Sequence, residues 1–352
     1  MTVLLLMGTM LCALTACGKN ENGKATEAVT ENTSTEAATE TATTEVATET
    51  ATTEAATEAA TEVKALTMTN EILGEGYEFA YAEEPQKIVS VASPATEMLL
   101  ALGLEEKIVG YAMQDNEIPE KYKEAFASLN LITEGWDISN EMILALEPDF
   151  LMFWNGDASY TYEFLNANGI STYTMLSDVT GAKIESVYED FRNMGKIFGV
   201  EERAEEIISE MEEKIKKAEE KVSQKESVKA AYVDAYSTDE AAFTAGDALV
   251  ADIFRSAGAE NVMNHTEDTW MNISWEEMAA SNPEYIVIGV YAGVEDADYW
   301  IDFLKNHPAM SEVDAVKNER FVIVGLADLT VGERVADTVG ILAEAFHPEN
   351  QK

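Results

Sequence analysis

Positive charge is scarce in this chain. Its 352 residues carry 23 Lys and Arg against 66 Asp and Glu, which gives a formal net charge of −43 at pH 7. Residues 21–62 hold ten Glu and one Lys, a net charge of −9, so −34 is left for the rest of the chain. A surface with this charge repels phosphate backbones and anionic lipid headgroups, and nucleic-acid binding is therefore disfavoured.

Histidine is also scarce, and several common catalytic motifs are absent. The chain has three His, and it contains no Gly-x-Ser-x-Gly elbow, no glycine-rich phosphate loop and no His-Glu-x-x-His pair. No clustered set of His, Asp, Glu and Cys has the ligand spacing of a bare transition-metal site. The sequence therefore predicts a binding protein rather than an enzyme, with no cofactor or resident metal of its own.

Cysteine occurs only twice, at Cys12 and Cys17. Cys12 lies in the apolar run of residues 2–16, and Cys17 directly follows Leu-Thr-Ala, a sequence typical of a bacterial lipobox. The alternative is a transmembrane anchor, but the run is too short to span a bilayer comfortably. We expect residues 1–17 to be a lipoprotein signal peptide and Cys17 to be lipidated. The mature protein would then have no disulfide, and its lipid would hold it on the outer face of the cell membrane.

Residues 18–64 hold few large apolar side chains and consist mainly of Thr, Ala and Glu. Glu recurs at gaps that alternate between four and five residues, which is not a helical period. Such a segment cannot bury enough apolar surface to offset the entropy of folding. It is predicted to be a disordered, self-repelling tether.

The longest regular pattern covers residues 201–224 and is helical. Glu and Lys surround one apolar stripe, and neither Gly nor Pro interrupts the pattern. At 1.5 Å per residue such a helix is about 36 Å long. The stripe consists of Ala204, Ile207, Ile208, Met211, Ile215, Ala218 and Val222. The pattern fits an ordinary surface helix, and it also fits a rigid strut that joins two lobes, residues 65–200 and 225–352.

A repeated pattern on either side of this helix favours two lobes. Residues 138–141 (ISNE) are followed by a helical turn, Pro148 and an apolar run. Residues 273–276 (ISWE) are followed by a similar turn, Pro283 and another apolar run, 135 positions later. Both copies predict a Ser N-cap, a short helix that stops before Pro, and a buried strand. We interpret the pair as a structural repeat.

The folded part is predicted to begin near residue 65 with a β-hairpin formed by residues 66–69 and 77–80. Residues 87–91 then predict a strand, Ser93 an N-cap, Pro94 the first helical turn, and residues 108–110 a second strand. Together they form a βαβ unit, and open α/β sheets bind ligands at the carboxyl ends of their strands. The predicted fold class is α/β, with two Rossmann-like lobes.

Residues 87–97 (KIVSVASPATE), followed by Ala-Leu-Gly at 101–103 and by residues 143–149 (ILALEPD), resemble the iron-siderophore and cobalamin substrate-binding proteins of ABC transporters. The resemblance extends from about residue 66 to residues 347–349, nearly all of the folded part. It implies two Rossmann-like lobes that are joined by one long helix and move little when the ligand binds. It also implies a permease partner in the membrane.

The same resemblance implies that one exposed Glu on each lobe meets an arginine of the permease, and Glu141 and Glu276 match those positions. A different reason for the two Glu is available, because the helix dipole favours an acidic residue in the first turn of any helix. Charge pairs at such a contact mainly set register and association rate.

The ligand is expected between the lobes, on loops that follow strands. Flat aromatic side chains with a few polar groups suit a bulky planar or caged ligand, although each aromatic could instead cap a core. By the resemblance, Trp154 also matches a position where cobalamin-binding members carry a cleft tryptophan, and Arg334 matches a frequent arginine of the family. The expected ligand-binding residues are Gln114, Trp136, Trp154, Tyr236, His265, Trp270, Tyr291 and Arg334.

The class of ligand stays open between a ferric siderophore, a corrinoid and haem. Tyr236, Tyr291 and His265 are possible axial ligands for haem, although a lone His is more often structural. Arg334 is the one obvious cation for an anionic siderophore. A chelatase-like enzyme on the same double fold is the less favoured alternative. We expect a monomeric receptor that takes up a metal chelate.

Overall fold

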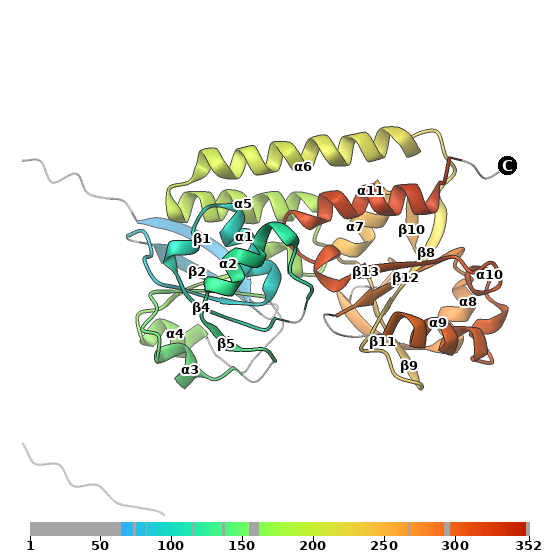
Figure 1. Ribbon diagram of the computed structural model, residues 1–352, viewed down its shortest axis with the longest axis horizontal. Coiled ribbons are helices and arrows are strands. Elements are labelled where there is room, and N and C mark those ends of the chain that lie inside the picture. Colours follow the sequence, from blue (N-terminus) through green and yellow to red (C-terminus); the bar gives the residue numbers. More distant parts are fainter. Residues whose placement is uncertain are drawn as a thin grey trace, which may run out of the picture. The chain divides into compact units, whose positions relative to one another are not determined.

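The structure is a computed structural model that describes residues 65–349, apart from 73–74, 82, 115, 136–137, 155–161, 267 and 292–295. The described residues belong to one compact unit, residues 61–352 (Figure 1). Within this part of the chain, no helix has the length and apolar character that a membrane span requires. The predicted signal peptide, with Cys17, and the predicted tether lie outside the described residues.

The first lobe is built on a five-stranded parallel sheet with the order β5-β4-β3-β6-β7. The strands β3 and β6 are apolar throughout except for Ser90 and are fully buried, as expected for a parallel sheet that helices cover on both faces. The sheet strands are β3 (Ile88–Val91), β4 (Ile108–Ala112), β5 (Leu131–Thr133), β6 (Phe150–Phe153) and β7 (Ser171–Thr174). The helices between them are α1 (Ser93–Ala101), α2 (Lys123–Ser128), α3 (Asn140–Leu144) and α4 (Tyr162–Ala167).

The predicted hairpin and the predicted βαβ unit are both present. The hairpin strands β1 (Leu66–Ile72) and β2 (Glu75–Tyr81) pair antiparallel and contact β7. The cap of α1 differs from the prediction, because Ala92 and not Ser93 is the N-cap, with φ 89°. The Ser93 hydroxyl donates instead to the Met113 carbonyl, 3.0 Å away, and so ties α1 to the end of β4.

The second lobe is built on a four-stranded parallel sheet with the order β10-β8-β12-β13, beside an antiparallel pair β9–β11. The strands are β8 (Val228–Asp234), β9 (Ala241–Ala245), β10 (Ala259–Asn261), β11 (Trp270–Ser274), β12 (Tyr285–Val290) and β13 (Phe321–Gly325). The helices are α7 (Leu249–Ser256), α8 (Trp275–Ser281), α9 (Asp296–Asn306), α10 (Asp314–Lys317) and α11 (Arg334–Phe346).

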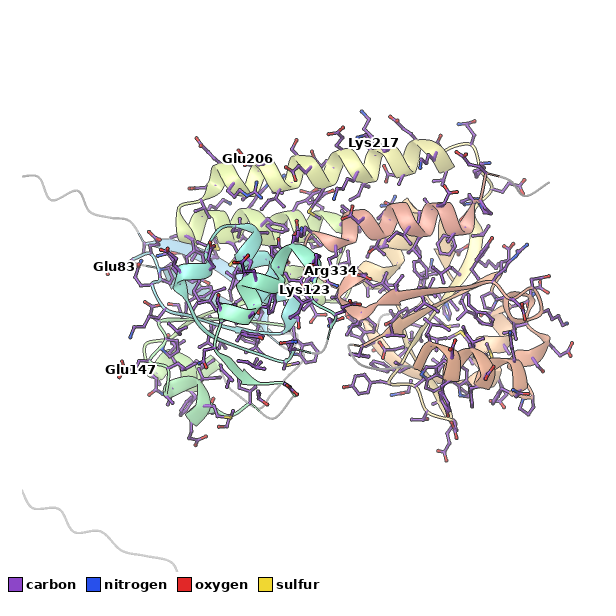
Figure 2. All side chains as sticks on the ribbon, in the orientation of Figure 1. Glu83, Lys123, Glu147, Glu206, Lys217 and Arg334 are labelled. Atoms are coloured by element: carbon purple, nitrogen blue, oxygen red, sulfur yellow. The ribbon has the colours of Figure 1, made fainter. Side chains whose placement is uncertain are left out.

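Two long helices lie between the sheets in sequence, α5 (Ile184–Phe198) and α6 (Glu201–Val222). Gly199, with φ 64°, provides the left-handed turn that ends α5. α6 packs on α5 and on α11 of the second lobe, and all seven residues of the predicted apolar stripe are buried (Figure 1). On the opposite side of α6, Glu206 and Lys217 point away from the rest of the molecule (Figure 2).

The two lobes share one hydrophobic core. A single cluster of buried apolar side chains includes residues of the first sheet, of α5, α6, α7 and α11, and of one face of the second sheet. In β8, Ala230 and Tyr232 belong to this cluster, while Ala231 and Val233 point into a second cluster on the other face. Moving the lobes apart would expose the shared core, so the lobes are expected to move little.

The predicted repeat is present at both of its positions. The Ser139 hydroxyl accepts a hydrogen bond from the Met142 amide at the start of α3 (3.3 Å), and the Ser274 hydroxyl accepts one from the Glu277 amide at the start of α8 (3.1 Å). After Pro148 and Pro283 the chain enters β6 and β12, respectively. The sequence echo therefore corresponds to the same cap, helix and strand in each lobe.

Candidate functional site

A cavity of about 900 Å³ lies between the two sheets, at the carboxyl ends of their strands. Its lining from the first lobe includes Ala92, Met113, Trp154 and Met175, which directly follow β3, β4, β6 and β7. Its lining from the second lobe includes Asp234, Tyr291 and Leu326, at or directly after the ends of β8, β12 and β13. Parallel strands bring their carboxyl ends to one edge of a sheet, which explains why these positions converge. The volume is in the range of small-molecule sites.

The backbone of the first lobe is strained where it meets the cavity. Ala92 and Met113 have φ values of 89° and 61°, which side-chain-bearing residues rarely adopt. The Ala92 amide donates to the Ala112 carbonyl at 3.0 Å, and the Ser93 amide donates to the Met113 carbonyl at 3.2 Å. These bonds hold two adjacent strand ends in a fixed arrangement. Such strained residues are often found at binding sites.

Aromatic side chains form the wall of the cavity in the second lobe. The rings of Trp270 and Phe243 are stacked, with centroids 6.0 Å apart and an interplanar angle of 22°. The ring of Tyr236 meets that of Tyr291 edge to face, with centroids 4.8 Å apart. Trp154 lines the cavity from the first lobe. The site therefore offers flat apolar surfaces from both lobes to a bulky ligand.

One buried carboxylate, Asp234, lies in this wall. Its Oδ2 accepts a hydrogen bond from the Tyr232 hydroxyl (2.7 Å), and its Oδ1 accepts bonds from the Tyr236 amide (2.8 Å) and the Tyr291 hydroxyl (3.2 Å). Burial raises the pKa of Asp234 above its ordinary value, and the three donors act in the opposite direction. These donors fix the carboxylate and also orient the Tyr291 ring.

A second buried carboxylate, Asp190 of α5, holds a turn whose residues line the cavity. It accepts hydrogen bonds from the Tyr173 hydroxyl (2.7 Å), the Leu176 amide (2.8 Å), the Ser177 amide (3.0 Å) and the Ser177 hydroxyl (2.6 Å). Burial raises the pKa of Asp190 to about 6, while these hydrogen bonds act to lower it. The contacts hold the turn between Met175 and Asp178, which both line the cavity.

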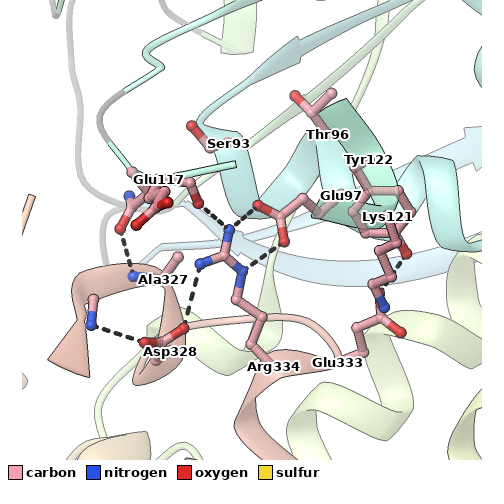
Figure 3. Close-up of polar contacts among 12 residues, drawn as sticks. Ser93, Thr96, Glu97, Glu117, Lys121, Tyr122, Ala327, Asp328, Glu333 and Arg334 are labelled. Carbon is pink, nitrogen blue, oxygen red and sulfur yellow. Dashed lines mark hydrogen bonds and ion pairs between the residues drawn. The ribbon is translucent and has the colours of Figure 1, made fainter. Parts of the chain in front are cut away.

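Arg334, at the start of α11 and three residues after the cavity-lining Val331, joins the two lobes (Figure 3). Its Nε donates to Oε2 of Glu97 at 2.7 Å, and its Nη2 donates to Oε1 of Glu97 at 2.5 Å and to the Glu117 carbonyl at 2.6 Å. Its Nη1 contacts Asp328 Oδ1 at 3.3 Å. Arg334 is not among the described residues that line the cavity. Its charge is used in a bidentate ion pair with the other lobe.

Three further hydrogen bonds between the lobes surround this ion pair (Figure 3). Glu333 accepts hydrogen bonds from Lys121 and from the Tyr122 hydroxyl, and the Ala327 amide donates to Asn116 Oδ1 at 2.7 Å. Since Asn116 also lines the cavity, the contacts between the lobes extend to its edge.

The other sequence-predicted residues divide into two groups. Trp154, Tyr236, Trp270 and Tyr291 come together at the cavity. Gln114 and His265 are not among its described lining residues: Gln114 accepts a hydrogen bond from the Tyr111 hydroxyl (2.7 Å), and His265 is exposed in a turn. Trp136 lies outside the described residues. Glu141 and Glu276 are exposed in the first turns of α3 and α8.

Sequence reasoning missed Ala92, Met113, Met175 and Asp234. Each of them ends or directly follows a buried strand, and that rule had already selected Trp154, Tyr236 and Tyr291. Applied to the predicted strand of residues 87–91, it would have found Ala92, whereas β7, the strand before Met175, was not predicted. Among the described residues, no group of three or more His, Cys, Asp or Glu is arranged to hold a metal ion.

Two α/β lobes joined by a long helix, with a large aromatic cavity at the strand ends of both sheets, define a bilobal solute-binding protein. Residues 88–325 match the model of the periplasmic binding protein family, and the chain belongs to this family. The resemblance stated from the sequence is thereby confirmed.

Similar proteins support the assignment. The chain is 26% identical over 279 residues to the uncharacterised ABC transporter substrate-binding lipoprotein YvrC of Bacillus subtilis, which covers 77% of this chain and 82% of that protein. It is 26% identical over 207 residues to a vitamin B12-binding protein of Pectobacterium carotovorum, 58% of this chain and 71% of that one. The crystal structure of a periplasmic binding protein from Veillonella parvula superposes with a TM-score of 0.74 and 27% identity, covering 80% of this chain and 98% of that one.

Proposed function

We propose that this protein is the substrate-binding lipoprotein of an ABC importer and that it captures a metal chelate, a corrinoid or a ferric siderophore, between its two lobes. The single observation that carries the proposal is the cavity at the strand ends of both sheets, with aromatic side chains from each lobe. Binding rather than catalysis is the function. Lipidation at Cys17 keeps the protein at the membrane, and the tether gives the folded part its reach.

The shape and chemistry of the cavity support a bulky ligand. Trp154 faces it from one lobe, and Trp270, Tyr236 and Tyr291 face it from the other. Rigid aromatic surfaces on two sides bind a flat or caged molecule with little loss of side-chain entropy. The similarity to a vitamin B12-binding protein is consistent with a corrinoid.

Transfer to the permease is proposed to use Glu141 and Glu276. Both are exposed, and both lie in the first turn of a helix that a serine caps, at equivalent points of the repeat. Since one Glu belongs to each lobe, a permease can contact both only when the lobes have the right spacing. That spacing is kept nearly constant by the shared core.

Haem is the second candidate ligand, because Tyr236 and Tyr291 bring two phenol groups to the cavity. The hydroxyl of Tyr291 is held by Asp234, a carboxylate partner that would increase the basicity of a phenol acting as axial ligand. Haem also carries two propionates, and these need cationic partners. For that reason the corrinoid and siderophore alternatives are preferred.

The test is titration of the full-length protein with cyanocobalamin, ferrioxamine B and haemin, followed by tryptophan fluorescence with corrections for the absorbance of the ligands. We expect saturable quenching by one chelate at micromolar or lower concentration. Trp154→Leu and Trp270→Leu should each weaken that chelate about tenfold or more, since buried aromatic anchors dominate binding energy. Trp300→Leu is the matched control. Trp300 belongs to the second cluster of buried side chains and is not among the described residues that line the cavity, so this variant should leave affinity unchanged. Equal affinity in all three variants would contradict the proposed site.

A further inference from the structure

The ionisable side chains that line the cavity have one sign of charge. Asp178 comes from the first lobe and Asp234 from the second, and the described lining residues include no Lys, Arg or His. The short segments between residues 65 and 349 that lie outside the described residues also contain no Lys, Arg or His. No cation from these segments is therefore available to the cavity, wherever they lie.

Two cations at the contact between the lobes, Arg334 and Lys121, are used within the protein (Figure 3). The guanidinium of Arg334 faces two carboxylates, Glu97 and Asp328, as well as the Glu117 carbonyl. The ammonium of Lys121 is paired with Glu333. Around Arg334 the two acidic groups outnumber the single cation, so this side of the cavity adds no positive field that an anionic ligand could use.

The Asp234 carboxylate in the cavity wall is held in a fixed orientation. Three donors, from Tyr232, Tyr236 and Tyr291, are directed at the two oxygens of Asp234. They suit an ionised carboxylate, which accepts hydrogen bonds at both oxygens. The aromatic rings around it have electron-rich faces, and such faces also attract cations. The carboxylate and the rings thus favour the same sign of ligand charge.

We propose that this cavity selects its ligand by charge: it takes a neutral or cationic metal chelate, with its positive or hydrogen-bond-donating group towards Asp234, and rejects anionic chelates of the same size. This inference rests on the proposed function and adds the charge class of the substrate. An anionic ligand would lose its water shell on entering and find carboxylates rather than cations. A cationic ligand would exchange water for Asp234, and the negative charge of the whole chain would attract it from a distance.

The experiment compares chelates that share a core and differ in charge, by calorimetric titration of the full-length protein. One series is ferrioxamine B, which has a free ammonium group, its neutral N-acetyl derivative and its anionic N-succinyl derivative. The other is aquacobalamin, neutral cyanocobalamin and a monocarboxylate of cyanocobalamin. In the series that binds, the anionic member should bind at least about tenfold more weakly than the cationic member.

Variants then locate the effect. Asp234→Asn should reduce the ratio of cationic to anionic affinity several-fold, and Asp178→Asn should reduce it in the same direction. Asp302→Asn removes an identical charge at an exposed position on α9 and should leave the ratio unchanged. The comparison of chelates on the unaltered protein needs no variant, so a folding defect in Asp234→Asn would not affect the test.

The outcomes are distinct. Equal or tighter binding of the anionic members, or tightest binding of haemin or ferric citrate, would overturn charge selection and leave the proposed receptor function intact. The assignment to Asp234 and Asp178 would also be overturned if the unaltered protein is selective but neither cavity variant changes the ratio of cationic to anionic affinity. If no chelate of any charge binds, the proposed function itself fails, and the inference fails with it.

Discussion

Removal of either partner of the Glu97–Arg334 ion pair should destabilise the protein strongly. The two side chains are only 4% and 15% exposed, and the guanidinium makes two hydrogen bonds to the carboxylate across the lobes. Glu97→Gln or Arg334→Gln leaves the other charge buried with incomplete compensation, which costs about 3–5 kcal/mol. For a folded unit of this size the loss corresponds to a decrease in Tm of about 10 °C.

The double variant should be less destabilised than the sum of the two single variants. It leaves neither charge unpaired, so the coupling energy from a double-mutant cycle should be about 2–3 kcal/mol. Urea unfolding of the four proteins, followed by far-UV circular dichroism, gives the free energies. Lys217→Gln, which breaks the exposed pair with Glu213 on α6, is the control and should cost about 0.5 kcal/mol or less. Single losses below about 1 kcal/mol that simply add would show that the interlobe pair behaves like a surface pair and would refute the reasoning.

Three further predictions follow from the cavity and the surface. Asp190 has a pKa of about 6 in the folded state and an ordinary value near 3.8, so the folded state binds the proton more tightly. The favourable contribution of Asp190 to stability is therefore complete below about pH 4 and is lost as the pH rises through 6. The stability of wild type minus that of Asp190→Asn should therefore fall by about 2 kcal/mol between pH 4 and pH 7, and a difference that rises or stays flat in urea titrations would contradict this. Ala92→Gly should raise the free energy of unfolding by about 1 kcal/mol, because Gly tolerates φ 89°, and a loss of stability in urea would mean that Ala92 is not strained. The Glu141→Ala, Glu276→Ala double variant should abolish chelate uptake by cells while calorimetric affinity is unchanged; normal uptake would rule out docking through these residues.

The sequence predicted the features that depend on local patterns. α6 was predictable because its stripe of seven apolar residues has a helical period and no breaker, and every one of them is buried. The repeat was predictable because Ser139 and Ser274 carry their own capping chemistry, which needs no distant partner. Trp154, Tyr236 and Tyr291 were predictable because they follow strands whose carboxyl ends must converge, whereas Trp270 is the first residue of β11.

What the sequence did not predict depends on contacts between distant residues. The ion pair of Arg334 was not predicted, because its partner Glu97 lies 237 positions earlier in the chain and no local pattern indicates that pairing. Asp234 lies at the end of an apolar strand, and only the fold reveals that Tyr291, 57 positions later, donates to it. The cap of α1 was assigned to Ser93 because its hydroxyl was expected to bond locally, whereas it bonds across to β4.

The most direct test of the central claim is hydrogen–deuterium exchange of the full-length protein, with and without saturating cyanocobalamin or ferrioxamine B. Capture between the lobes predicts slower exchange at the strand ends of both lobes together, in peptides that contain Met113 and Met175 of the first and Tyr236 and Tyr291 of the second. Slower exchange in one lobe only, or only at surfaces remote from the cavity, would contradict the account.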